Sequence, residues 1–192
     1  DLNPVAGVRT TWGTPGLADH VPTVSDPLVE RIEARGGVVI GKTNTPEMGA
    51  GANTFNAVFG PTRNPWDTRM NAGGSSGGAA ASLAVGEAWL SHGSDFGGSL
   101  RTPASFCGIV GLRPSPGVAG GPDMRGGFVT LPAQGPMARN VADVALFLDA
   151  MSGYSDHWPT AYPAPEEPYL QTCLADPGPM RIAFAPDLGG LA

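Results

Sequence analysis

Cysteine and lysine are scarce in this sequence. Its 192 residues include two cysteines, Cys107 and Cys173, and a single lysine, Lys42. Two cysteines are too few for a disulfide framework or a cysteine-based metal site. We therefore expect a reducing, cytoplasmic compartment and no bound metal.

Charged residues are also sparse, at 15% of the chain, and the net charge is −6. The ten arginines are scattered, which argues against a nucleic-acid groove or an anionic membrane surface as the main partner. No apolar run approaches the roughly 20 residues that a membrane helix needs, and the first residues do not resemble a signal peptide. We expect a small-molecule partner, with no nucleic acid and no membrane.

Glycine and proline are abundant, with 29 and 20 residues, beside a hydrophobic content of 41%. They are interleaved with apolar segments, which argues against a disordered, low-complexity chain. The length suits one sizeable domain. The composition predicts a fold that is rich in turns and in close backbone packing.

Helices and short apolar strands alternate along the chain, which is typical of an α/β fold. Asp26 and Pro27 open a helix that Gly36 stops, and a short buried strand is expected at residues 38–40. Asn140 caps an amphipathic helix with one apolar side and an end at Gly153. That apolar side comprises Val141, Val144, Ala145, Leu148 and Met151.

The remaining segments give a weaker pattern. We expect helices at 79–85 and 100–106, strands at 88–90 and 109–112, and loops at 43–71 and 116–135. Residues 154–179 form a proline-rich linker, and 181–185 begin one more strand.

Two glycine- and serine-rich segments stand out, GGSSGG at 73–78 and GSDFGGS at 93–99. Neither matches the phosphate-binding patterns GxxxxGK[ST] or GxGxxG. The first formally matches the nucleophile pattern GxSxG, but that mechanism needs a histidine. His20, His92 and His157 are the candidates, and no sequence context distinguishes them.

A third interpretation uses both segments together. Ser99 stands at a helix start, where the N–H groups of Phe96, Gly97, Gly98 and Ser99 could converge on a carbonyl oxygen while the Ser99 hydroxyl attacks its carbon. Such donors are each worth roughly 3 kcal/mol of rate acceleration. The serine still needs a base, and Lys42 at a strand end is either that base or a solvated or ion-paired side chain.

The sequence resembles the amidase signature family from Asp1 to its end. The resemblance rests on GGSSGG and GSDFGGSLRTPASFCGIVGLRPSPG, together with GVRTTWGTP, GKTNTPEMG and QGPMARNVAD. It implies a large mixed β-sheet core flanked by helices. It also implies hydrolysis of a carbon–nitrogen bond in an amide, or in a carbamate such as a urethane, through an acyl-enzyme and without a cofactor.

The resemblance also implies roles for particular residues. Ser99 would be the nucleophile and Ser75 the second serine, in a cis peptide bond with Gly74, with an oxyanion hole formed by the amides of 96–99. Ser76, Asp95 and Arg101 would support the loop.

In the family, a catalytic lysine directly precedes the residue equivalent to Asp1, and Lys42 in GKTNTPE is not used as the base. The resemblance therefore implies that residues 1–192 are part of a single catalytic domain truncated at both ends, which needs the missing segments of its parent chain. A neutral lysine would take the proton of Ser99 through Ser75. Alone, this chain would be inactive or nearly so.

Two rival functions remain open. One is a histidine-dependent serine hydrolase, and the other is a catalytically silent, amidase-like subunit that assembles with partners. Two departures, GVAGG after Pro116 and His92 in place of a small or acidic residue, concern the rim of the pocket. The sequence leaves a homodimer open.

Overall fold

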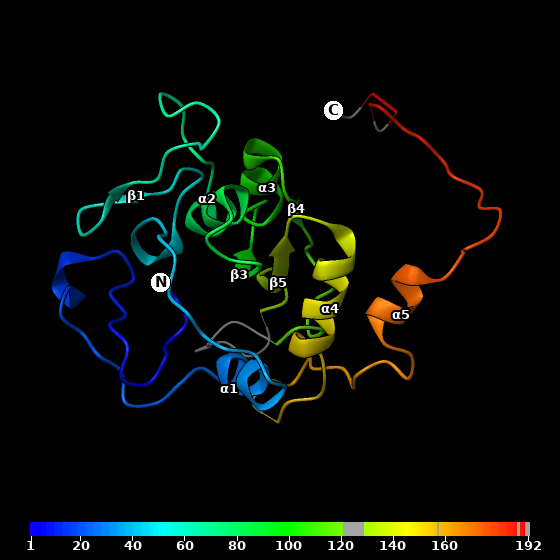
Figure 1. The fold of residues 1–192 in the computed structure, drawn as a ribbon, viewed down its shortest axis with the longest axis horizontal. Helices are drawn as coiled ribbons and strands as arrows, with labels where there is room; N and C mark the ends of the chain where they lie inside the picture. The colour runs from blue at the N-terminus through cyan, green and yellow to red at the C-terminus, as the bar shows by residue number, and fades with distance from the viewer. Residues whose placement is uncertain (121–128, 157, 188, 191–192) are drawn as a thin grey trace.

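The computed structural model describes residues 1–120, 129–156, 158–187 and 189–190. A small sheet lies at the centre, with helices packed around it (Figure 1). The last residues extend away from the rest of the molecule, while the segment before α1 lies on the opposite side. Among the described residues, no helix has the length and apolar character required to span a bilayer.

The central sheet has the order β3-β5-β4, and both pairs are antiparallel. The strands are β3 (Leu90–Asp95), β4 (Val110–Gly111) and β5 (Ala133–Ala138). The register pairs Leu90 with Ala138 and Asp95 with Ala133. Because β5 is the middle strand, all of its residues are buried.

Two helices, α2 (Gly77–Val85) and α3 (Arg101–Cys107), pack together beside this sheet. Their contact is made mostly by small side chains, which let the elements approach closely. The buried cluster comprises Ala72, Ala79, Ala80, Leu83, Leu100, Ala104, Cys107 and Met137. The α2 helix begins within the first glycine- and serine-rich segment, at Gly77, and α3 begins two residues after the end of the second, at Arg101.

A second cluster joins α1 (Pro27–Ala34) to α4 (Val141–Met151). It includes Leu28, Phe147, Met151 and Trp158. Asp26 caps α1 by accepting the N–H of Leu28 at 2.8 Å, and Asn140 caps α4 by accepting the N–H of Asp143 at 2.9 Å. Both predicted helices and both predicted caps are thus confirmed.

Short elements complete the chain. They are the 3-10 helices η1 (Pro15–Leu17) and η2 (Glu47–Gly49), the hairpin of β1 (Phe55–Asn56) and β2 (Gly60–Pro61), and α5 (Tyr169–Leu174). The α5 helix lies within the predicted linker 154–179. Its first amides, those of Tyr169 and Leu170, donate to Asp149 of α4 at 2.7 and 3.0 Å.

The α/β class is confirmed, and the sheet of the described residues has three antiparallel strands. The buried strand predicted at 38–40 is wrong: Val38 is 82% exposed and Ile40 is 75% exposed. The strand predicted at 181–185 is also absent, and Ile182 is 83% exposed. In both cases an apolar, β-branched run lacks a partner strand among the described residues, so no ladder forms.

Other predicted elements differ in their bounds. The helices at 79–85 and 100–106 and the strand at 109–112 correspond to α2, α3 and β4. The strand expected at 88–90 begins only at Leu90 and continues to Asp95, the third residue of the second glycine-rich segment. The first half of β5, residues 133–135, lies within the predicted loop 116–135. In α4, Val141 is exposed and Phe147 is buried, contrary to the predicted face.

Candidate active site

The two glycine- and serine-rich segments meet in space. The N–H of Ser76, at the start of α2, donates to the carbonyl oxygen of Ser99, which stands just before α3. The N···O distance is 3.3 Å. This bond brings Ser75 and Ser99 into neighbouring loops, although they are far apart in sequence.

Thr54 supports the first of these loops from behind. Its hydroxyl lies 2.9 Å from the carbonyl oxygen of Gly73 and 3.2 Å from that of Ser75, and it accepts the N–H of Gly77 at 3.0 Å. The peptide bond between Gly74 and Ser75 is cis. A Cβ on Gly74 would lie 2.9 Å from the backbone of residues 52–53, so this position requires a glycine.

Ser76 ties the same loop to the sheet. Its Oγ accepts the N–H of Ser94 and donates to the Ser94 carbonyl oxygen, each at 3.3 Å. Because both backbone groups of Ser94 bind Ser76 and β3 is an edge strand of the central sheet, these Ser94 groups lie on the outer edge of β3.

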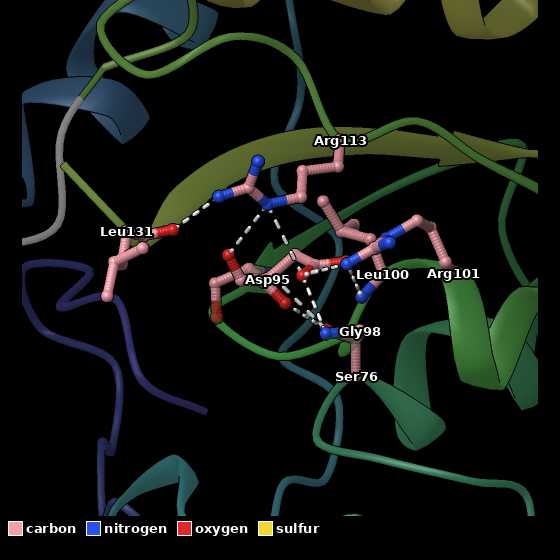
Figure 2. A network of polar contacts seen from close by, with 8 residues as sticks. Ser76, Asp95, Gly98, Leu100, Arg101, Arg113 and Leu131 are labelled. Atoms are coloured by element: carbon pink, nitrogen blue, oxygen red, sulfur yellow. Dashed lines mark hydrogen bonds and ion pairs between the residues drawn. The ribbon is translucent and has the colours of Figure 1, made fainter. Parts of the chain in front are cut away.

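Asp95 anchors the second loop (Figure 2). Its side chain is 0% exposed, and its oxygens accept the N–H of Gly98 at 2.8 Å and of Leu100 at 3.1 Å. Arg101 donates to both oxygens, from Nε at 3.0 Å and from Nη2 at 3.1 Å. Burial raises the pKa of Asp95, but the hydrogen bonds from Arg101 and the two amides outweigh it, so this pKa lies below its ordinary value.

This arrangement changes one detail of the predicted oxyanion hole. The Gly98 amide donates to Asp95 Oδ1 and is therefore directed away from a substrate oxygen. Phe96 and Gly97 are exposed at the outer face of the turn, and Ser99 is half-buried. The amides of Phe96, Gly97 and Ser99 remain as candidate donors.

A cavity of about 240 Å³ lies beside Ser75 and Ser76. Asp1, Lys42 and His92 line part of its polar surface, and apolar side chains of α1, of residues 38–40 and of Phe147 in α4 line part of its apolar surface. Ser99 is not one of the described residues on its wall, so Ser75 is the serine of the pair that faces this space.

Lys42 is bound to other groups in this cavity. Its Nζ lies 3.1 Å from Asp1 Oδ1 and also donates to the Thr10 hydroxyl. Burial lowers the pKa of Lys42 to about 8. The backbone nitrogen of Asp1 donates to the Thr43 carbonyl at 2.7 Å.

Comparison with protein-family models decides the family. The Amidase model matches residues 1–191 of this chain. The chain belongs to the amidase family.

Two curated relatives illustrate the similarity of this amidase chain. It is 42% identical over 189 residues to an acylamidase from Rhodococcus erythropolis, covering 98% of this chain and 40% of that one. It is also 42% identical over 185 residues to one subunit of the glutamyl-tRNA(Gln) amidotransferase from Moorella thermoacetica, covering 96% and 36%.

A solved structure shows the same fold. The structure of 6-aminohexanoate cyclic dimer hydrolase complexed with substrate superposes with a TM-score of 0.87 at 34% identity, over 94% of this chain and 38% of that chain. The chain therefore spans about two fifths of the length of the relatives it matches.

Among the described residues of this amidase chain, neither histidine is hydrogen-bonded to Ser75 or Ser99. His92 Nε2 is hydrogen-bonded to Gln134 Oε1 across the sheet, and burial lowers the pKa of His92 to about 4, against the opposing effect of that bond. His20 is exposed in a loop. His157 lies outside the described residues.

The sequence did not predict two residues that support these loops, Thr54 and Arg113. Thr54 lies in the segment predicted as a featureless loop, and no pattern marks it. Arg113 contacts Asp95 through Nε, 3.4 Å from Oδ1 and 3.4 Å from the Asp95 carbonyl oxygen. Arg113 lies in GLRPSPG, part of the segment that carries the family resemblance. It is 18 residues from Asp95 in sequence, so no local pattern predicts the contact.

Proposed function

We propose that the protein containing this chain hydrolyses the carbon–nitrogen bond of an amide or carbamate through an acyl-enzyme on Ser99. One observation carries the proposal: the Ser75 and Ser99 loops are joined by the bond between Ser76 N–H and the Ser99 carbonyl. Membership of the amidase family supports the reaction class. The substrate is a small molecule, and the mechanism needs no metal.

In the proposed first step, Ser99 Oγ attacks the substrate carbonyl carbon and the carbonyl oxygen becomes an oxyanion. Amide N–H groups of Phe96, Gly97 and Ser99 donate to this oxygen. Removing one such donor typically raises the activation free energy by roughly 3 kcal/mol and so slows the reaction. The buried Asp95 holds the turn in shape, so the donors need little reorganisation.

In the proposed proton transfer, the Ser99 hydroxyl gives its proton to the Ser75 hydroxyl. Ser75 passes a proton on to a neutral lysine that directly precedes Asp1. The shared position of Asp1 and Ser75 on one cavity wall supports this assignment. The lysine returns the proton through Ser75 to the leaving nitrogen as the carbon–nitrogen bond breaks. Water then attacks the acyl-enzyme, which releases the acid and restores Ser99.

We further propose that residues 1–192 form part of one catalytic domain, so activity belongs to the complete polypeptide. The relatives include an acylamidase and a 6-aminohexanoate cyclic dimer hydrolase, so acyl amides are the natural first substrates to assay.

A fluorophosphonate probe tests the nucleophile. We expect the complete protein to be labelled once, at Ser99, and Ser99→Ala to abolish both labelling and amide hydrolysis. Ser75→Ala should slow labelling by roughly a hundredfold or more, since it removes the proton relay. Ser105→Ala is the matched control, because Ser105 is exposed on α3, and it should label normally.

Other results would favour the rivals. A folded, complete protein without a label at Ser99 would point to the catalytically silent subunit. Loss of labelling in His92→Gln, with the lysine before Asp1 dispensable, would point to the histidine-dependent hydrolase.

A further inference from the structure

Arg113 connects three segments that are remote in sequence (Figure 2). It follows β4, and its Nε lies 3.4 Å from Asp95 Oδ1 and 3.4 Å from the Asp95 carbonyl oxygen. Its Nη2 donates to the carbonyl oxygen of Leu131, just before β5. The Arg113 side chain is 25% exposed; its contact with the buried Asp95 is partly buried, whereas its contact with the exposed Leu131 lies at the surface.

Arg101 binds the same carboxylate in a different way. It belongs to the loop that Asp95 itself holds, and its side chain is 59% exposed. Its contacts therefore close the loop on itself. Arg113, in contrast, links Asp95 at the end of β3 to the segment after β4 and to the segment before β5.

We infer that Arg113 is a positioning residue for Ser99. The inference rests on the proposed function and extends it. Arg113 orients the Asp95 carboxylate, and that carboxylate accepts the N–H groups of Gly98 and Leu100, the residues on both sides of Ser99. A displacement of Asp95 is thereby transmitted to the nucleophile and to the amides beside it.

The guanidinium geometry is needed for this role. Nε and Nη2 of one planar group point to two different partners, Asp95 and Leu131. A lysine at this position keeps the charge but carries a single nitrogen on a flexible stem. Arg113→Lys therefore tests the bridge separately from the charge.

The experiment measures inactivation of the complete protein by a fluorophosphonate, which gives the maximal rate constant kinact and the half-saturating concentration KI. We expect Arg113→Lys and Arg113→Ala to lower kinact by roughly tenfold to a hundredfold, as misplacement of a reacting group does. KI should stay within about twofold, because Arg113 does not touch the probe. Millimolar methylguanidinium should partly restore kinact of Arg113→Ala.

Arg139→Ala is the matched control. Arg139 also bridges two backbone carbonyls, those of Leu83 at 2.9 Å and Ala88 at 2.7 Å, but it does not contact the Asp95 loop. We expect an unchanged kinact and no effect of methylguanidinium. Circular dichroism identifies any variant that fails to fold, and Arg113→Lys remains informative if Arg113→Ala unfolds.

The labelling results distinguish a failure of the proposed function from a failure of the positioning role of Arg113. If the parent protein is not labelled at Ser99, the proposed function fails. If the parent is labelled and a folded Arg113→Lys keeps the parental kinact, the positioning role is overturned. An equal loss in Arg139→Ala would also overturn it, since the effect would then reflect general stability.

Discussion

Replacing Asp95 by asparagine is the sharpest test of how the nucleophile loop is held. The substitution keeps the shape of the side chain but removes its charge and converts one acceptor oxygen into an NH2 donor. In the structure both oxygens are used, with Gly98 N–H at 2.8 Å from Oδ1 and Leu100 N–H at 3.1 Å from Oδ2. One of these amides must therefore lose its acceptor and face another donor.

The expected magnitude follows from the burial of Asp95, whose side chain is 0% exposed. A hydrogen bond to a charged group contributes about 1.5–3 kcal/mol. The amide left without an acceptor costs about 1–3 kcal/mol, whereas Arg101 and Arg113 are 59% and 25% exposed, so water compensates much of the lost ion pairing. Because these contributions overlap, we expect Asp95→Asn to lower the free energy of unfolding by about 3 kcal/mol and the Tm by about 6–12 °C.

The effect should depend on pH, with a sign that the pKa of Asp95 determines. This pKa is below its ordinary value in the folded protein, so the ionised form favours folding. The contribution is complete above the unfolded value of about 4 and disappears as the pH falls through the folded value. The stability difference between parent and Asp95→Asn should therefore be constant near neutrality and shrink below about pH 4.

Urea unfolding at pH 7 and at acidic pH measures both expectations. Asp67→Asn is a suitable control, because Asp67 also binds an arginine with both oxygens, at 2.9 and 2.7 Å from Arg69, but does so on the surface. We expect no measurable change in its unfolding midpoint. The reasoning is refuted if Asp95→Asn unfolds with the parent at pH 7, or if a difference persists unchanged at strongly acidic pH.

Local signals predicted the helices well. Asp26 and Asn140 mark helix starts because their side chains accept N–H groups within a few residues, and both bonds are present. Such a contact depends only on neighbouring residues, so the sequence suffices to find it.

The strands were harder to predict, because a strand depends on a partner that sequence does not locate. The apolar residues 38–40 and 181–185 resemble strands but stay exposed where no described strand pairs with them. The reverse error occurred in β5, whose first three residues, 133–135, lie in the segment predicted as a loop. Pro136 lacks an N–H but still contributes its carbonyl, which accepts the Leu112 N–H at 3.1 Å.

The candidate site shows the same limit. Composition predicted close backbone packing, and the resemblance to the amidase signature family supplied the roles of Ser75 and Ser99. Neither indicated that Lys42 pairs with Asp1 or that Arg113 reaches Asp95. These contacts join segments that only the folded chain brings together, and they hold the loops rather than define a motif.

Two further predictions concern the cap of α4 and the packing of β3 against Ser76 and Leu100. Asn140→Ala removes the cap of α4 and should lower the free energy of unfolding by about 1 kcal/mol in urea titrations, whereas Asn140→Ser should retain most of it. Gly93→Ala places a Cβ 2.7 Å from both Leu100 Cδ2 and Ser76 Oγ, so we expect about 1–3 kcal/mol of destabilisation from overpacking. Because Ser76 must move to admit this Cβ, fluorophosphonate labelling of Ser99 should slow as well. Parental labelling in a folded Gly93→Ala would mean that the bond between Ser76 and Ser99 does not set the geometry of the nucleophile.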